Sequence, residues 1–581
     1  MTKSKQLDQD QSIQAAKVIV EGEGVDEWGN RYFKFSVKGS KKTIPPFSVS
    51  QIVNNQSEFM TALINAGASL FTSNSQRTIL KQLEERQPED PSFKVATRLG
   101  WNGSVFVFPD EIVGTPKKPL ETSFSDLKPQ MLAKYRCKGT LKDWQDKIGS
   151  LCIRNSRLIF AASLACTGPV LRFVPGDKSG GFELVGLGET GKTCVAIIAG
   201  SFWGCHLVLE FRERGFCETW HTTSGKVEIT AFAHNDTILL LDETKLAGDN
   251  DKQRGQVVLR VVFSLSEGGE RERLTNVGSS RGWRFFFLST SNLTLAEMAQ
   301  QAGTTIGEAE FGRLVDIPLP VNRYGIYEDL HGFESGAALT DALKSRCRSY
   351  CGTPSREFVR KLVEEMAEDR DGLKKYLRTR RKGYLKRVGK LAEKEGLKLL
   401  NRVSGRFATV YAAGCLAIKY GIFPWSRNHL LQAILSCHLD SARLLKDQSQ
   451  ITSSSSSVQT PRQKLVTYLT EQQAEFLDLS AGLPDREEHE FGSVPGYIAS
   501  HKGEKWYYVA PEQLRELLGG QSNVKELAKT LVADGLMAKL PESRSESRWV
   551  VQRPIFSGKG NKGYERVYAF RASILERQAA G

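Results

Sequence analysis

The sequence lacks the features that would place it in a membrane, on a secretory route or among zinc-binding proteins. It has no stretch of 18 apolar residues free of charge and glycine, so no membrane-spanning helix is predicted. Its first residues, MTKSKQLDQDQS, include no apolar core of a signal peptide. None of the ten cysteines forms a CxxC pair, and Cys347 and Cys351 have no His or Cys neighbour at zinc-finger spacing. We therefore expect a cytoplasmic protein, without a membrane partner, whose cysteines are buried, reduced thiols.

What the sequence does contain is the composition of an ordinary globular protein with an excess of positive charge. Hydrophobic residues make up 40% and charged residues 25% of the 581 residues, which is enough for several packed cores. At about 150 residues per domain, three or four domains are expected. The formal net charge of +14 favours a polyanionic partner.

The apolar patterns divide the chain into five segments. Residues 1–130 combine strand and helix patterns, which are typical of a small α+β domain. Residues 131–335 alternate strands with helices and predict an α/β core with a parallel sheet. Residues 336–446 are helical almost throughout, 447–461 is serine-rich and predicts a flexible linker, and 462–581 forms a further domain. The strands expected in the core are 182–186, 206–211, 237–242 and 283–289.

A glycine-rich segment, GLGETGKT, lies between a strand-like run and a helix-like run of the core. It consists of Gly186, Leu187, Gly188, Glu189, Thr190, Gly191, Lys192 and Thr193. In the pattern GxxxxGK[ST], backbone N–H groups surround the β-phosphate of a nucleotide at a helix N-terminus. Lys192 then reaches the β- and γ-phosphate oxygens, and the Thr193 hydroxyl binds Mg²⁺. The segment predicts a site for ATP and Mg²⁺, the alternative being a glycine-rich turn in the core.

The segment DTILLLDET is an apolar strand that ends in Asp242 and Glu243. At the carboxyl end of a strand beside a phosphate-binding loop, an Asp can hold Mg²⁺ and the adjacent Glu can polarise an attacking water. The alternative is an acidic cap at the start of the next helix. The pair predicts ATP hydrolysis.

Two more positions extend this group of residues. The run WRFFFLSTSN ends a further buried strand with Ser289, Thr290, Ser291 and Asn292, whose short polar side chains can reach the γ-phosphate or the water, or merely form a turn. Arg313, in EFGRLVDIPLP, precedes a strand and can complete a neighbouring subunit's site as an arginine finger, or lie on the surface.

Together these segments resemble the AAA+ ATPases and are similar in particular to the minichromosome-maintenance helicases. The resemblance implies that Asn292 senses the γ-phosphate and that Arg313 acts in trans, although Gly312 and Leu314 depart from the usual finger segment. The chain also resembles a phage, plasmid and genomic-island family long catalogued as a domain of unknown function. The segments that carry this second resemblance, over about 1–440, are GTLKDWQDKIGSLCIRNSRL, ETWHTTSGKVEITAFAHNDTILLLDE and RFATVYAAGCLAIKYGIFPW.

The resemblance further implies a helical lid over 336–446 that directs an arginine at the γ-phosphate. Arg402 and Arg406 are the candidates in RVSGRFATVYAAG, with Arg406 favoured because the apolar helix begins beside it. Either can instead be a solvated or salt-bridged arginine.

Three segments are candidates for DNA binding. Between residues 374 and 406 the chain has thirteen Lys and Arg against two Glu, and Arg380, Arg381 and Lys382 lie within this run. Such a run can contact phosphates, hold another subunit, or be only a solvated helix face. Residues 268–286 resemble the pore hairpin of hexameric helicases, with Arg281 at the tip, and can equally be a surface hairpin. The C-terminal segment orders a helix and two β-rich arms as a winged helix does, with Lys559 and Lys562 in the turn. Duplex binding is favoured for it, and contact with another protein is the alternative.

The leading hypothesis is a ring-forming replication helicase of a mobile element, for which a hexamer is expected. It would use ATP and Mg²⁺ and act on single-stranded and duplex DNA, with other replication proteins as further partners. Two alternatives stay open: an AAA+ remodeler or loader acting on protein, and an origin-binding protein switched by nucleotide.

Overall fold

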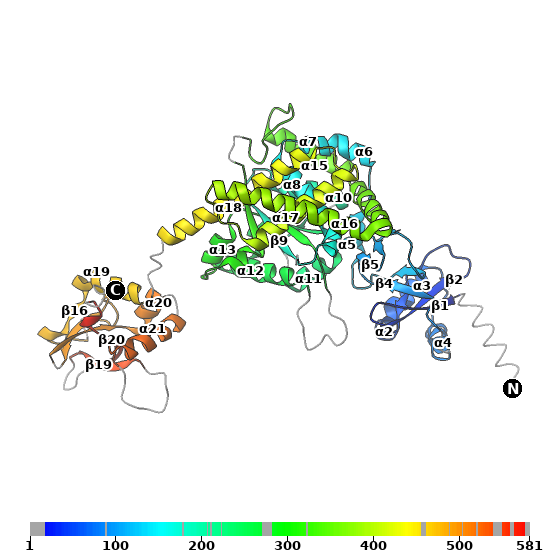
Figure 1. The fold of residues 1–581 in the computed structure, drawn as a ribbon. Helices are drawn as coiled ribbons and strands as arrows, with labels where there is room; N and C mark the ends of the chain where they lie inside the picture. The colour runs from blue at the N-terminus through cyan, green and yellow to red at the C-terminus, as the bar shows by residue number, and fades with distance from the viewer. Residues whose placement is uncertain are drawn as a thin grey trace, which may run out of the picture. The chain divides into compact units, whose positions relative to one another are not determined.

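The computed structural model divides into two units, Met1–Asp447 and Gln448–Gly581. Figure 1 shows their elements in chain order. The structure describes residues 18–86, 90–176, 179–205, 207–209, 212–221, 224–269, 282–320, 324–454, 461–486, 489–501, 503–518, 521–538, 549–557 and 563–575. In these described ranges no helix has the length and apolar character needed to cross a membrane.

The first part of the first unit combines helices and sheets, as its sequence patterns predict. A five-stranded sheet has the order β3-β2-β1-β4-β8, and β5-β6-β7 form a second sheet. Helices pack on the first sheet around buried Phe35, Phe59 and Leu63. The elements are β1 (Val18–Val25), β2 (Arg31–Val37), β3 (Phe47–Ser48), α2 (Val49–Asn54), α3 (Gln56–Asn65), α4 (Ser73–Glu84), β4 (Phe93–Ala96), β5 (Gly100–Asn102), β6 (Val105–Val107), β7 (Ile112–Val113) and β8 (Leu120–Thr122).

The central sheet of the first unit is parallel and has the order β12-β13-β14-β9-β15. Its strands are β9 (Gly180–Val185), β12 (Glu218–Thr219), β13 (Ile238–Asp242), β14 (Phe286–Ser291) and β15 (Leu314–Pro318). After β9 the chain crosses to the far edge, returns through β13 and β14, and then adds β15 on the other side of β9. This reversal of strand order brings the carboxyl ends of β9 and its neighbours together at the edge where open α/β sheets bind ligands.

One strand predicted for this sheet is wrong. Residues Leu207–Leu209 (β10) pair with Arg212–Arg214 (β11) in a separate antiparallel ribbon. The edge of the central sheet is instead the two-residue β12. An apolar run indicates a strand but does not reveal which sheet the strand joins, because that depends on distant partners.

Helices cover both faces of the central sheet. On one face Phe182 of β9 contacts Phe160 of α8 and Phe407 of α17. On the other face, Phe287 of β14 and Leu265 of α12 share a buried cluster. The elements from β8 to β9 are α5 (Pro129–Leu132), η1 (Ala133–Tyr135), α6 (Leu141–Trp144), η2 (Gln145–Gly149), α7 (Ser150–Cys152), α8 (Ser156–Ala165), α9 (Thr167–Val170) and η3 (Leu171–Phe173). Those within the sheet's connections are α10 (Lys192–Trp203), α11 (Ser224–Ala233), η4 (Thr244–Ala247), α12 (Asp251–Glu267), α13 (Leu295–Gln301) and α14 (Glu308–Phe311).

The helical segment after β15 shares the main hydrophobic core of the first unit. Its helices are α15 (Gly336–Ser349), α16 (Thr353–Lys394), α17 (Asn401–Lys419) and α18 (Arg427–Ser454). Phe358 of α16, Phe407 of α17 and Ile434 of α18 are buried in the same cluster as Phe160 and Phe182. The predicted lid segment is therefore packed onto the sheet as a layer of the core.

The flexible linker predicted at 447–461 is wrong over its first half, because α18 continues through Ser454. Residues 455–460 lie outside the described residues, and α19 begins at Pro461. Once a helix is nucleated, Ser, Gln and Asp residues extend it at a cost of only about 0.7 kcal/mol or less per residue. The absence of an apolar period therefore does not end the helix.

The second unit builds a five-stranded sheet in the order β16-β17-β18-β20-β19. Its elements are α19 (Pro461–Glu471), η5 (Gln473–Glu475), β16 (Leu477–Asp478), η6 (Leu479–Ala481), β17 (Tyr497–His501), β18 (Glu504–Val509), α20 (Pro511–Leu518), α21 (Gln521–Ala533), β19 (Val551–Phe556), β20 (Gly563–Arg571) and η7 (Ala572–Ile574). The predicted order of a helix followed by two antiparallel arms is present in α21, β19 and β20. The winged-helix interpretation stays a prediction.

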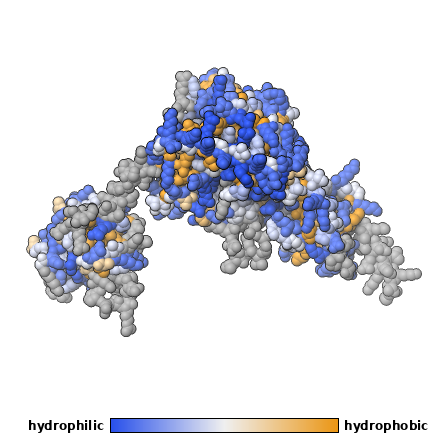
Figure 2. Space-filling model, viewed as in Figure 1, coloured by the Kyte–Doolittle hydropathy of each residue, from blue (hydrophilic) through white to orange (hydrophobic). Residues whose placement is uncertain are grey.

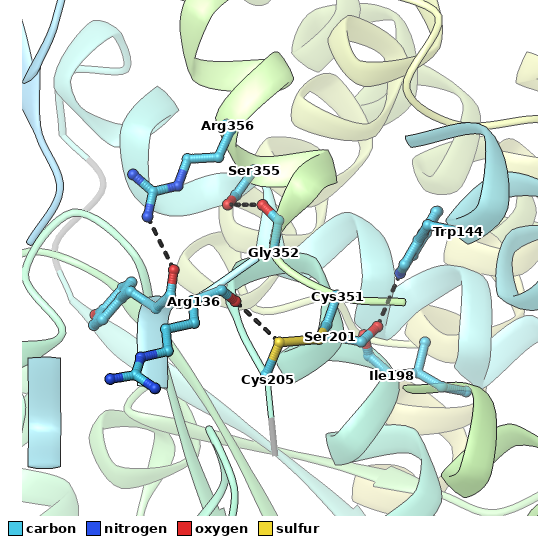
Figure 3. The surroundings of a disulfide bond; sticks show 10 residues. Arg136, Trp144, Ile198, Ser201, Cys205, Cys351, Gly352, Ser355 and Arg356 are labelled. Atoms are coloured by element: carbon cyan, nitrogen blue, oxygen red, sulfur yellow. Dashed lines mark hydrogen bonds between the residues drawn. A yellow bond between two sulfur atoms is a disulfide. The ribbon is translucent and has the colours of Figure 1, made fainter. Parts of the chain in front are cut away.

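Two of the ten cysteines form a disulfide, so the expectation of free thiols throughout is wrong. Cys205, just after α10, is bonded to Cys351, just before α16 (Figure 3). Beside the bond, Gly352 N–H donates to the Ser201 carbonyl over 2.8 Å, which also ties α16 to α10. The two cysteines are 146 residues apart, so sequence spacing could not reveal the pair.

Candidate active site

The glycine-rich loop joins β9 to α10 at the carboxyl edge of the central sheet, as predicted. Gly191 has φ +98° and Glu189 has φ +60°, both in the left-handed region. A Cβ atom at Gly191 would lie 2.8 Å from Ile326 Cγ2, and one at Gly186 would lie 2.4 Å from Leu319 Cδ1. The left-handed backbone disfavours a larger residue at Gly191, and a larger residue at Gly186 would require the Leu319 side chain to move. The loop N–H groups lie at the start of α10, where the helix dipole favours an anion.

Lys192 closes the loop on itself. Its Nζ donates to the Gly186 carbonyl at 2.7 Å, to the Leu187 carbonyl at 2.6 Å and to Asn292 Oδ1 at 3.1 Å. Burial lowers the pKa of the Lys192 ammonium, while the acidic pair at the end of β13 raises it. Because these three hydrogen bonds go to neutral oxygens, the ammonium can exchange them for phosphate oxygens, which bind it more strongly.

The acidic pair at the end of β13 is held by Thr290 of β14. The Thr290 hydroxyl donates to Asp242 Oδ1 at 2.6 Å and accepts the Glu243 N–H at 2.9 Å. The exposed Thr193 hydroxyl donates to the same Asp242 oxygen at 3.2 Å, which brings the loop and the pair together.

Glu243 shows strain of the kind found at functional sites. Its φ is +62°, which costs a non-glycine residue energy. Its Oε1 is buried and has no hydrogen-bond partner among the described residues. Because buried polar atoms normally have partners, this oxygen fits a site that is completed by water or ligand.

The polar residues that end β14 divide between the two faces of the sheet. Ser289 donates to Glu183 Oε1 at 2.8 Å and accepts from Trp220 Nε1 at 3.0 Å, within the core. Ser291 accepts the Thr244 hydroxyl at 2.8 Å. Asn292 alone of the four binds Lys192, so the structure brings Asn292 to the loop and turns Ser289 away from it.

Arg313 and Arg406 lie at the opposite, amino end of the sheet. Arg313 immediately precedes β15, and its carbonyl accepts the N–H of Gly181 at the start of β9, at 2.8 Å. Its guanidinium lies 3.4 Å from Glu310 Oε1, 3.6 Å from Glu267 Oε1 and 4.6 Å from the centre of the half-exposed Phe263 ring. Arg313, Glu310 and Phe263 border a groove of about 330 Å³. The structure does not bring Arg313 to the loop of its own chain.

Arg406 is 2% exposed and binds backbone. Its Nη1 donates to the Arg313 carbonyl at 3.1 Å and its Nη2 to the Ser179 carbonyl at 3.2 Å. It therefore ties α17 to the amino ends of β9 and β15, one strand length away from the loop. Arg402 is exposed on the same helix.

The candidate DNA-binding residues differ in exposure. Arg380 lies over the Tyr376 ring, with 4.9 Å to its centre, and Arg381 Nη2 donates to the Gly405 carbonyl at 3.5 Å, so both are half-buried. Lys382 is exposed. The remaining candidates, Arg281, Lys559 and Lys562, lie outside the described residues.

Comparison with known proteins gives one family match. Residues 1–284 match the model of a family described as a domain of unknown function, DUF927. The matched range agrees with the resemblance to such a family over that part of the chain, whereas the resemblance extends to about residue 440. A solved structure described as "SCCmec type IV Cch - active helicase" is 15% identical, with 96% of this chain and 94% of that chain covered and a TM-score of 0.49. No curated protein matches the chain.

Sequence reasoning missed how Thr290 acts. The run of four polar residues after an apolar strand indicated a polar site, but a polar run does not show which hydroxyl faces the acidic pair. Side chains alternate between the two faces of a strand, so Thr290 and Asn292 share one face and Ser289 and Ser291 share the other. Which face meets the acidic pair is decided only when the strand pairs with its neighbours. The register of β14 beside β13, with Leu241 opposite Ser289, makes that assignment.

Proposed function

We propose that the chain is an ATP-dependent, ring-forming DNA translocase that separates strands during replication of a mobile genetic element. The observation that carries the ATPase part is the convergence of three strand ends on one loop. Lys192 contacts Asn292 at 3.1 Å, and Thr193 and Thr290 contact the same Asp242 oxygen at 3.2 and 2.6 Å. The DNA part rests on the resemblance to replicative helicases, and the mobile element rests on the resemblance to the phage, plasmid and genomic-island family.

The residues present fit ATP and Mg²⁺. Gly186, Gly188, Glu189, Thr190 and Gly191 would supply the backbone cradle. Gly188 faces open space, because a Cβ there would meet only Asn292 Nδ2, at 4.0 Å. Bound ATP with Mg²⁺ would supply the γ-phosphoryl group whose hydrolysis releases free energy for movement.

The protein side chains then have separate roles. Lys192 neutralises charge on the β- and γ-phosphate oxygens, and the Thr193 hydroxyl and Asp242 carboxylate hold the metal. Glu243, whose Oε1 has no partner among the described residues, orients and polarises a water. Asn292 contacts the γ-phosphate, and Thr290 keeps the acidic pair in place.

Arg313 would act on the site of an adjacent subunit. Its position at the amino end of β15 leaves it one strand length from its own loop, so a catalytic role requires a second copy of the chain. Arg313 is 17% exposed and borders an open groove, where a neighbouring surface has access to it. This supports a ring, for which six subunits are the number implied by the resemblance.

A row of exposed cations on α16 would contact the DNA backbone. Arg378, Lys382, Lys386, Lys390 and Lys394 follow one another at intervals of four residues, about 6 Å along the helix axis. Among the described residues none of the five has an ion-pair partner. Figure 2 shows mostly hydrophilic residues on the face of the first unit that it draws. Lys382 belongs to this row, whereas Arg380 and Arg381 support the helix packing.

One experiment tests the proposal: unwinding of a forked duplex by the purified chain with ATP, measured beside ATP hydrolysis with and without single-stranded DNA. We expect strand separation and hydrolysis that DNA stimulates. Hydrolysis that is indifferent to DNA would favour a protein remodeler instead, and binding of ATP without turnover would favour a nucleotide-switched binding protein.

A further inference from the structure

Two arginines flank one buried contact at the amino end of the central sheet. Asp236, just before β13, is 2% exposed and accepts the Trp101 N–H at 3.0 Å. Arg284, just before β14, donates to the other oxygen of Asp236 from Nε and Nη2, at 2.9 and 2.6 Å. Arg172 of η3 lies over the Trp101 ring, with 5.0 Å from its guanidinium carbon to the ring centre. Trp101 and Asp236 thus hold Arg172 and Arg284 on the same part of the surface.

Arg370 lies in α16, just after a break in that helix. Residue Asp369 leaves helical geometry, with φ −148° and ψ 81°, and α16 packs against η3. The acidic neighbours of Arg370 are engaged elsewhere: Asp369 accepts the Gly372 N–H at 2.8 Å, and Asp371 lies 3.1 Å from Lys374. Arg370 is exposed, and no described residue forms an ion pair with it.

Among the described residues, Asp236 is the one carboxylate that forms an ion pair with any of the three guanidinium groups. Burial lowers the pKa of Arg172, and the charges of Arg370 and Arg284 lower it further, whereas Asp236 raises it. Arg172 makes one further hydrogen bond, to the Gly103 carbonyl at 2.6 Å, and the Arg284 side chain is 38% exposed. The repulsion between neighbouring guanidinium groups is reduced when an anion lies between them.

We propose that Arg172, Arg284 and Arg370 form a second binding site for the phosphodiester backbone of DNA, in which Arg370 lies eight residues before Arg378, the first residue of the cation row on α16. The inference rests on the proposed function and adds a contact at the amino end of the sheet, away from the glycine-rich loop. Guanidinium groups favour phosphate because their fork geometry matches two phosphate oxygens at once. Trp101 is 5% exposed, so it orders Arg172 and is not available to stack on a base. The site therefore binds DNA without sequence preference.

The test uses the full chain without nucleotide and fluorescein-labelled oligothymidylate of about 30 nucleotides, with binding followed by fluorescence anisotropy over a series of salt concentrations. Arg370→Glu is the main variant, because Arg370 is exposed and its replacement leaves no described partner unpaired. We expect affinity about tenfold weaker, the scale of a single charge-assisted hydrogen bond. The salt dependence should also flatten, by about 0.7 in slope for each phosphate that the variant no longer neutralises.

Two further variants serve as controls. Lys142→Glu changes the net charge equally at a side chain on α6 that is 75% exposed, and should bind as the unaltered chain does. Arg172→Lys keeps the charge over Trp101 but removes the fork, and should weaken binding about threefold, less than Arg370→Glu. Thermal melting checks that all three variants fold.

Each outcome has a distinct meaning. Equal affinity of Arg370→Glu and the unaltered chain, or an equal loss in Lys142→Glu, would overturn the site while leaving the proposed translocase intact. Competition by poly-glutamate as effective as that of unlabelled oligothymidylate would overturn the preference for phosphodiester. An unaltered chain that binds no oligothymidylate would overturn both the site and the proposed function.

Discussion

The two ends of the central sheet are built differently. At the carboxyl end, Glu189 and Glu243 have positive φ, and Glu243 Oε1 is buried with no described partner. At the amino end, Arg406 donates to two backbone carbonyls, and Asp236 accepts from Arg284 and from the Trp101 N–H. Asp236 also has a positive φ, of +55°, but both of its carboxylate oxygens are hydrogen-bonded, whereas Glu243 Oε1 is not. The two ends therefore differ in the pairing of these carboxylates.

This difference distinguishes residues that stabilise the fold from residues that take part in the reaction. Backbone strain and unpaired polar atoms cost free energy, and they persist where a ligand can use them. The hydrogen bonds that join α17 to the amino ends of β9 and β15 raise the free energy of unfolding, and they lie away from the loop. We therefore expect substitutions at the carboxyl end to change turnover in the chain's own site, and those at the amino end to change stability, contacts between subunits or the binding of DNA.

Arg313 gives the largest expected effect, because it is the amino-end residue for which we propose a chemical role. Arg313→Ala should bind ATP normally and hydrolyse it about 10³- to 10⁵-fold more slowly, as is typical of arginine fingers. Arg260→Ala, at an exposed arginine of the same groove, is the control. Mixing Arg313→Ala with Glu243→Gln subunits should restore some hydrolysis. No recovery in mixtures that exchange subunits would falsify the trans role.

Lys192 tests the carboxyl end directly. Lys192→Ala removes the cation whose Nζ lies 2.7 Å from the Gly186 carbonyl, and hydrolysis should fall by about 10²- to 10³-fold, the scale of removing one donor from a preorganised site. Lys245→Ala, an exposed lysine just after the acidic pair, should keep its activity. Steady-state ATPase assays compare the turnover of the two variants, and near-normal turnover in Lys192→Ala would exclude an ATP site at this loop.

A buried pair of carboxyl groups lies between the two ends and should make stability depend on pH. Asp316 of β15 is opposite Glu183 of β9, and burial raises the pKa of Asp316 from 3.8 to about 7 and raises that of Glu183 as well. The folded state keeps a proton that the unfolded chain releases above pH 3.8. Stability should therefore fall as the pH rises from about 4 to about 7, by on the order of 4 kcal/mol.

Chemical denaturation at a series of pH values measures this dependence. Asp316→Asn still accepts the Leu295 N–H that lies 3.0 Å from Oδ2, but does not titrate. Its stability should vary less between pH 4 and 7. A slope that is unchanged in this variant would show that other groups cause the pH dependence.

Arg406 measures the structural role of the amino end. Arg406→Met leaves the Ser179 and Arg313 carbonyls without their guanidinium donor, and unfolding free energy should fall by about 2 kcal/mol. Affinity for ATP should stay within about twofold. Arg402→Met, at an exposed position of the same helix, should change neither quantity. A loss of ATP affinity confined to Arg406→Met would restore the lid role expected from the resemblance.

Thr290 gives the smallest expected effect. Thr290→Val keeps the shape of the side chain but loses the hydrogen bonds to Asp242 and to the Glu243 N–H, and hydrolysis should fall about tenfold, the scale of one or two neutral hydrogen bonds. Thr290→Ser retains the hydroxyl and should recover most of the rate. If valine and serine behave alike, Thr290 does not position the pair.

Local order along the chain was enough to predict the loop and the acidic pair. GLGETGKT between a strand and a helix, and LLLDE at a strand end, are patterns in which neighbouring residues carry the whole signal. The place of Asn292 beside the loop was also predictable, because Asn292 directly follows a third buried strand and parallel strands end at the same edge.

Only the tertiary structure decided the features that depend on distant partners. Residues 207–209 have the apolar pattern of a core strand, yet pair with β11, because pairing depends on which edges are free. Cys205 and Cys351 meet because α10 and α16 pack side by side. Arg406 looked like a lid residue beside an apolar helix, but the packing of α17 on β9 directs it to the amino end of the sheet. Sequence patterns report local conformation and burial, whereas the direction of a side chain depends on contacts between segments hundreds of residues apart.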